Sequence, residues 1–135
     1  MADAEYGIVR HVKLDYDRAV EVTREALKEQ GFGVLTEIDV KKTMKAKLDL
    51  EFRPYIILGA CNPQLAHKAL TAEPDIGLML PCNVVVYEEV PGSCVVEAIS
   101  PMAALGAVDI PALKEVADQA QAKLEAAMDV VAAKG

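Results

Sequence analysis

With 135 residues, of which 53% are hydrophobic, the chain is long enough to bury the core of one domain and needs no second one. Its formal net charge of −7 argues against general nucleic-acid binding, which requires a basic surface to neutralise phosphates, and it disfavours a membrane surface for the same reason. No stretch reaches the roughly 18 apolar residues that span a bilayer, and the first residues do not resemble a signal peptide. Three cysteines leave at least one thiol unpaired, which fits a reducing compartment. We therefore expect a single cytoplasmic domain over residues 1–135.

The first elements are predicted from the pattern of β-branched and apolar residues. Residues 5–13 mix β-branched with polar residues and are predicted to form a strand. Asp15 is expected to cap a helix, and Gly31 is expected to end that helix in the left-handed conformation. Residues 32–40 are predicted to form a second strand.

A short amphipathic helix is predicted over residues 41–50, where the helical periodicity returns. Its polar side holds four lysines in the segment Lys41 to Lys47, and together with Arg53 they form a basic cluster in an acidic sequence. Such a cluster could bind an anionic group such as a phosphate or a carboxylate. A run of charge on one face of a short helix is usually the solvated face, however, and no glycine-rich phosphate loop accompanies this one.

The central stretch reads as a strand that leads directly into a helix. Residues 55–60 form an apolar run typical of a buried strand. Asn62 is a favoured N-cap, and Pro63 suits the first helical position, so a helix is predicted to follow to residue 72. After Glu73-Pro74 ends this helix, residues 76–80 are predicted to return to a strand.

The last third of the chain is predicted to form a hairpin and a long helix. Pro91-Gly92 is the signature of a type II turn, so residues 84–90 and 94–100 are expected to pair as antiparallel strands. A final helix is expected to begin near Asp109 or Pro111. Its apolar residues recur at alternating spacings of four and three and form one seam. That seam consists of Leu113, Ala117, Ala120, Leu124, Ala127 and Val131.

Taken together, these elements predict an α+β fold. The order is strand, helix, strand, short helix, strand, short helix, three strands and helix. We expect a mainly antiparallel sheet of five or six strands, with the helices that begin at Asp15 and near Asp109 packed on one face.

Three segments also carry a resemblance to a known family: GFGVLTEIDVKKTMKAKLDLEFR (31–53), PYIILGACNP (54–63) and IGLMLPCNVVVYEE (76–89). They resemble the DUF302 family, a domain of unknown function. The resemblance implies a compact domain similar to the TATA-box-binding-protein-like arrangement of helices on a curved antiparallel sheet, often seen as a homodimer. It implies no established activity. Such proteins commonly have an acidic residue before the proline of the last strand, whereas this chain has Ser100-Pro101, so no role that needs that carboxylate is expected here.

The two Cys-Asn pairs, Cys61-Asn62 and Cys82-Asn83, each adjoin an apolar run. Our first hypothesis is a homodimeric binding module whose pocket is lined by these four residues and holds a small ligand or a soft metal ion. The amides would orient the ligand and the thiols would supply soft contacts. The simpler interpretation is that these cysteines fill space in the core, because cysteine is among the most buried residue types.

A second hypothesis is a thiol-based enzyme. Cys61 precedes a predicted helix N-terminus, which favours the thiolate, so it could be a nucleophile or a redox centre that Cys82 resolves. A third is that both thiols only pack and the protein acts through its surface as an interaction partner. The sequence lacks the close cysteine pairs of a zinc site and shows no clear general acid or base, so no metal ligand, catalytic residue or cofactor is assigned.

The apolar strands predict self-association. A sheet built from three strongly apolar strands has more apolar surface than two helices cover, and a large exposed apolar face is rare on monomers. We therefore expect a symmetric homodimer that buries part of the sheet or the seam between Leu113 and Val131.

Overall fold

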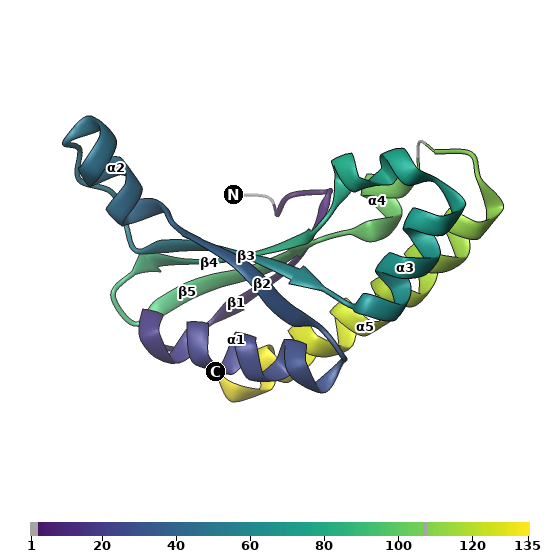
Figure 1. Cartoon of the computed structure of the whole chain (residues 1–135). Coiled ribbons are helices and arrows are strands. Elements are labelled where there is room, and N and C mark those ends of the chain that lie inside the picture. The colour runs from purple at the N-terminus through teal and green to yellow at the C-terminus, as the bar shows by residue number, and fades with distance from the viewer. Residues whose placement is uncertain (1–2, 107) are drawn as a thin grey trace.

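The structure is a computed structural model that describes residues 3–106 and 108–135. In this part of the chain, five strands form one antiparallel sheet in the order β1-β5-β4-β3-β2. The strands are β1 (Gly7–Val12), β2 (Gly33–Asp39), β3 (Tyr55–Cys61), β4 (Cys82–Val90) and β5 (Ser93–Ile99). Helices α1 (Tyr16–Glu29) and α5 (Pro111–Lys134) cover one face of this sheet (Figure 1). The α+β fold with helices on one face is therefore confirmed.

The core lies between the sheet and these two helices. Alternate residues of β3, β4 and β5, such as Leu58, Val84 and Val96, are fully buried there. Leu124 and Val131 of α5 are fully buried in the same cluster. The apolar seam of α5 is therefore buried within the chain. The face of the sheet that α1 and α5 do not cover is the one that a partner could contact. We call that uncovered side the open face.

Helix α1 has the two end signals that the sequence predicts. The Asp15 carboxylate accepts a hydrogen bond from the backbone N–H of Arg18 at 2.8 Å, which satisfies one of the unpaired amides of the first turn. At the other end Gly31 has φ +80°, a left-handed conformation that a Cβ disfavours.

Helix α3 (Pro63–Ala72) follows β3 as predicted. Asn62 lies between the two elements in extended geometry, and its side chain caps the helix. Helix α5 begins at Pro111, the second of the two predicted starts, and its N-cap position, Ile110, makes no side-chain hydrogen bond.

The predicted strand over residues 76–80 is wrong. Residues Pro74–Met79 form a 3₁₀ helix, η1, which begins where Glu73 Oε1 accepts a hydrogen bond from the N–H of Asp75. Both edges of β3 are already paired, with β2 and with β4, so the sheet has no ladder position for this segment there. Ile76 is buried whereas Leu78 is 89% exposed, so the run was apolar without being a buried strand.

The hairpin of β4 and β5 is confirmed, with Gly92 at φ +85° in the turn. A short helix that the sequence did not predict, α4 (Pro101–Leu105), follows β5 directly. Ser100 caps it: its Oγ accepts from the N–H of Ala103 at 3.3 Å and donates to Gln121 Oε1 at 2.8 Å. The Ser100 hydroxyl therefore ties the end of the sheet to α5.

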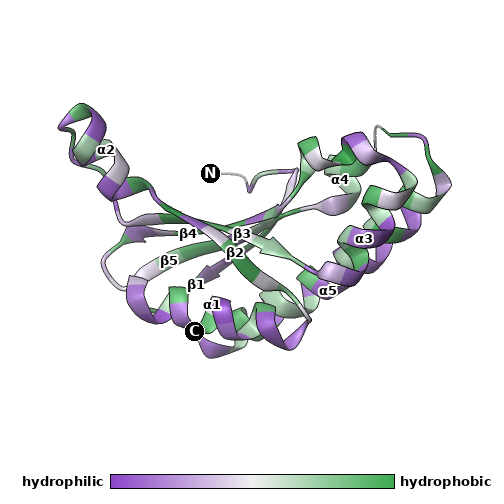
Figure 2. Ribbon diagram, viewed as in Figure 1, coloured by the Kyte–Doolittle hydropathy of each residue, from purple (hydrophilic) through white to green (hydrophobic). Residues whose placement is uncertain are grey.

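Helix α2 (Val40–Leu48) projects beyond the end of the sheet (Figure 1). It is capped by Asp39, and none of its residues is buried. The helix carries hydrophobic and hydrophilic residues together (Figure 2). Its predicted apolar side is thus not buried by the described residues of the same chain.

Among the described residues, no helix is both long enough and apolar enough to cross a membrane.

Candidate functional site

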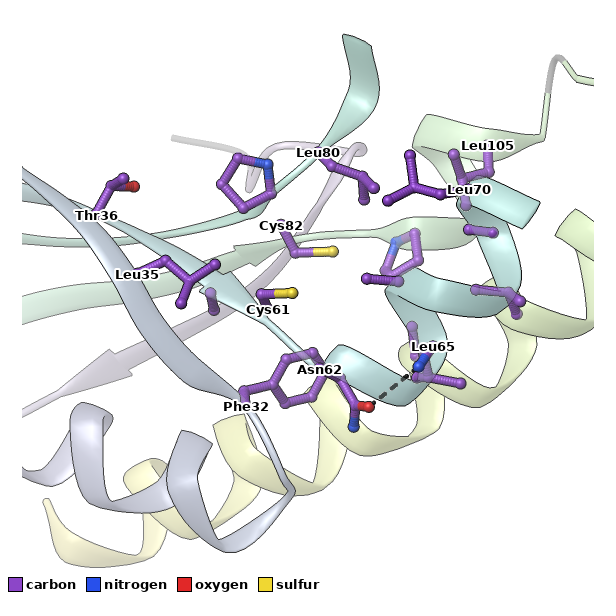
Figure 3. Close-up of a pocket in the computed structure, with 17 residues that line it drawn as sticks. Phe32, Leu35, Thr36, Cys61, Asn62, Leu65, Leu70, Leu80, Cys82 and Leu105 are labelled. Carbon is purple, nitrogen blue, oxygen red and sulfur yellow. Dashed lines mark hydrogen bonds between the residues drawn. The ribbon is translucent and has the colours of Figure 1, made fainter. Parts of the chain in front are cut away.

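A mostly apolar cavity lies where β3 ends and β4 begins, and we call it the strand-end pocket. It has a volume of about 310 Å³ and is enclosed by the ends of β2, β3 and β4 and by helices α3, α4 and α5 (Figure 3). Leu35 and Pro81 border it from the sheet side, and Leu65, Leu105 and Val116 border it from the helices.

The lining of the pocket is almost entirely carbon. Among its 17 lining residues, all of which lie in the described part of the chain, there is no Asp, Glu, Lys, Arg or His. The polar side chains are the two thiols, the amide of Asn62 and the hydroxyl of Thr36. A pocket with this lining binds apolar groups by removing them from water and offers few hydrogen bonds to a polar ligand.

Cys61 and Cys82 meet in this pocket. Cys61 is the last residue of β3 and Cys82 the first of β4, and the ladder pairs Cys82 with Ala60, the neighbour of Cys61. Both thiols are free and partly buried, and both side chains point into the cavity (Figure 3). Burial raises the pKa of Cys82, and the nearby charge of Cys61 raises it further. Cys82 is therefore kept as a neutral thiol.

Asn62 also borders the pocket, but its amide is already hydrogen-bonded. Its Oδ1 accepts from the N–H of Leu65 at 3.2 Å, and its Nδ2 lies 3.5 Å from the carbonyl oxygen of Gln30. The side chain thus joins the start of α3 to the end of α1, and its part in the site is to hold the wall in place.

Asn83 lies elsewhere. Successive strand residues point to opposite faces, so Asn83 points away from the side of Cys82 and is exposed on the open face beside Tyr55 and Glu97. The structure therefore brings together Cys61, Asn62 and Cys82 of the four predicted site residues and separates the fourth from them.

The remaining cysteine and histidines do not contribute to this pocket. Cys94 is fully buried in the core, where its thiol donates to the carbonyl of Leu14 and burial raises its pKa to about 11. His67 is exposed on α3, and His11 lies on β1 between Asp3 and Glu89. Within residues 3–106 and 108–135, no group of three or more His, Cys, Asp or Glu side chains is placed to hold a metal ion.

Several pocket residues were missed by sequence analysis. Leu35 reaches the pocket at an irregularity in β2, where the pairing with β3 shifts between Val34 and Thr36. Leu105 belongs to the unpredicted α4, and Val116 comes from α5. Each is an ordinary apolar residue in the sequence, so no local signal distinguishes it from the core.

The open face carries the second distinctive group of residues. The rings of Tyr55 and Tyr87 stack with centroids 5.2 Å apart, and the guanidinium of Arg53 lies 5.7 Å from the centroid of Tyr87. Glu97 lies among apolar neighbours on this face, and burial raises its pKa. Ile38 at one edge is 50% exposed.

The fold and the pocket define a small α+β domain with an apolar cavity at one end of an antiparallel sheet. The chain matches the family model described as "Domain of unknown function DUF302" over residues 8–131. It also resembles the crystal structure of an uncharacterized conserved protein DUF302 from Bacillus stearothermophilus, with 34% sequence identity and a TM-score of 0.85 over 94% of this chain and 98% of that one. The chain belongs to the DUF302 family. The search of curated proteins found no match.

Proposed function

We propose that this protein is a binding module that holds a small, mainly apolar ligand in the strand-end pocket. The observation that carries the proposal is the cavity of about 310 Å³ whose lining is apolar apart from two thiols, one amide and one hydroxyl. Its volume lies at the lower end of the roughly 300–1,000 Å³ range of small-molecule sites. A ligand of that size would gain free energy chiefly by transfer of its apolar surface out of water.

A thiol-based enzyme is the weaker alternative. Cys82 is kept protonated by its surroundings, and the described lining offers Cys61 no histidine or carboxylate that could act as a general base. A nucleophilic cysteine without such a partner has no group to remove its proton. The binding of an apolar ligand needs neither a thiolate nor a general base.

The proposal can be tested with the neutral naphthalene dye prodan, whose fluorescence rises in apolar surroundings. Ala66 on α3 lines the pocket, so Ala66→Leu should partly fill it. Ala72 lies near the end of the same helix, is exposed and does not line the pocket, so Ala72→Leu is the matched control. We expect prodan to bind the wild type and the control alike, and to bind Ala66→Leu at least ~10-fold more weakly.

Two results would contradict binding in this pocket: no fluorescence rise with the wild type, or equal dye affinity in the two variants while circular dichroism shows both folded. Native mass spectrometry of the protein purified without detergent adds a direct search for a retained natural ligand.

We further propose that the protein is a homodimer in which a second copy covers the open face. The face exposes apolar and aromatic side chains, and large uncovered patches of this kind are rare on monomers. Charge supports a second copy as the occupant: residues 40–53 hold five basic and two acidic side chains in a chain of net charge −7. The projecting α2 segment would therefore be attracted to the acidic remainder of a partner identical to itself.

A further inference from the structure

We propose that Cys61 and Cys82 together bind one soft, two-coordinate metal ion of the Cu(I) type at the sheet end of the strand-end pocket. This inference rests on the pocket of the proposed function and adds a second class of ligand to it. It follows from the number of donors, from their kind and from the apolar lining of the cavity.

The two sulfur atoms are the donors. They belong to adjacent antiparallel strands, because Cys61 is the last residue of β3 and Cys82 is the first residue of β4. Both side chains point into the same space and neither forms a disulfide (Figure 3). Cys61 also lies close enough to Cys82 for its charge to raise the pKa of that thiol.

No third strong donor is available within the described lining. The amide of Asn62 is engaged with Leu65 and Gln30, and no carboxylate or imidazole borders the pocket. Zinc requires four ligands, and calcium or magnesium requires several oxygens, so this donor set fits none of them. Two thiolates are sufficient for a soft monovalent ion that prefers sulfur and accepts a linear arrangement.

The charge balance of binding is simple. Two thiols and one monovalent cation give a bis-thiolate complex with a charge of minus one and release two protons. Helix α3, ten residues long, begins two residues after Cys61, and the partial positive charge of its N-terminus favours that negative complex. Because both protons must leave when the complex forms, the affinity should rise with pH.

The test uses Ag(I), which has the same preference for sulfur as Cu(I) and is not oxidised in air, titrated into the reduced full chain in chloride-free buffer. Calorimetry is expected to show one ion per chain and the release of two protons. Cys61→Ser and Cys82→Ser should each weaken binding by more than ~100-fold, which exceeds the usual loss when only a residue behind the metal ligands is changed. Cys94→Ala is the control, because Cys94 lies in the core and outside the pocket, and it should bind as the wild type does.

Phenylarsine oxide supplies an independent check, since it joins two neighbouring thiols to one arsenic with loss of one water. Intact-mass analysis should show one such adduct in the wild type and in Cys94→Ala and none in either serine variant. An ion that survives Cys61→Ser or Cys82→Ser, or the absence of a phenylarsenic adduct in the wild type, would overturn the proposal.

The same variants separate this inference from the proposed function. Both serine variants keep the apolar walls and should still bind prodan. Loss of the ion site alone would leave the apolar-ligand proposal standing, whereas silver binding without dye binding would remove the apolar ligand and keep the dithiol site.

Discussion

The side-chain oxygen of Asn62 accepts a hydrogen bond from the backbone N–H of Leu65 at 3.2 Å, and this contact marks where β3 ends and α3 begins. Replacing Asn62 by alanine should lower the free energy of unfolding by about 1 kcal/mol, the usual value of a helix N-cap. Loss of the longer contact with Gln30 would add to this cost. Urea unfolding followed by circular dichroism measures the change.

Asn83→Ala is the matched control for that measurement. Asn83 is exposed, and within the described residues its side chain makes no hydrogen bond, so the change should stay within about 0.5 kcal/mol. If both variants unfold at the same urea concentration as the wild type, the cap does not stabilise α3.

Gly59 leaves no room for a side chain. A Cβ at this position would lie 2.9 Å from Cγ of Pro81 and would also collide with the hydroxyl of Thr36. Gly59→Ala should therefore destabilise the protein by about 1–3 kcal/mol, the usual cost of overpacking. Adding Thr36→Ala should recover part of the loss, because it removes one of the two collisions, and thermal melts of the single and double variants test this coupling.

The control for Gly59 is Gly33, on the neighbouring strand, where a Cβ would meet nothing within 4 Å. Gly33→Ala should change stability by no more than about 0.5 kcal/mol. Equal melting temperatures for the two alanine variants would show that the strands separate easily at Gly59.

The local elements were predictable because their signals are local. Asp15, Gly31, Asn62 and the Pro91-Gly92 turn all act on neighbouring backbone, and each performs the predicted role. The prediction of a strand over residues 76–80 was wrong because it depended on pairing with a distant part of the chain. Whether an apolar run becomes a strand depends on a neighbouring strand that it can pair with. The strand before this run, β3, is already paired on both edges, with β2 and with β4.

The site was predictable only in part, because its residues are brought together by contacts between distant parts of the chain. The sequence indicates that Cys61 and Cys82 flank neighbouring elements, but it does not contain the register that places Cys82 opposite Ala60. Asn83 follows Cys82 directly in β4, so strand alternation points it to the other face, away from the pocket. The walls contributed by α4 and α5 come from far along the chain and give no local signal.

His11 should make stability depend on pH. Its Nε2 lies 2.8 Å from Asp3 Oδ1 and its Nδ1 lies 3.4 Å from Glu89 Oε1, and these hydrogen bonds raise its pKa above 6.5, that of Asp3 most strongly. Because the folded pKa is the higher one, the stabilisation is complete below about pH 6.5 and is lost as pH rises through the folded value. The ring is about half exposed, so the effect should stay below about 1 kcal/mol and weaken with salt.

Proton NMR titration of the His11 ring measures this pKa directly, and Glu89→Gln should lower it. His11→Gln should flatten the dependence of unfolding free energy on pH across that range. A ring that titrates at or below 6.5 in the wild type would contradict the two contacts.

The open face predicts the state of assembly. The side chain of Ile57 on β3 points to this face, since it alternates with the buried Ile56 and Leu58, so a charge there is tolerated by a monomer and opposed by a partner that covers it. Sedimentation equilibrium at micromolar concentration should give the wild type twice the 14.5 kDa mass of one chain. Ile57→Lys should sediment as a folded monomer, whereas Leu78→Lys, at a position on η1 that is 89% exposed, should remain dimeric.

High salt should weaken the wild-type dimer if the basic α2 segment contacts an acidic partner surface, because screening reduces attraction between exposed charges. A wild-type mass near 14.5 kDa would show that a single chain tolerates its uncovered sheet, and a dimer that persists in Ile57→Lys would place the contact elsewhere.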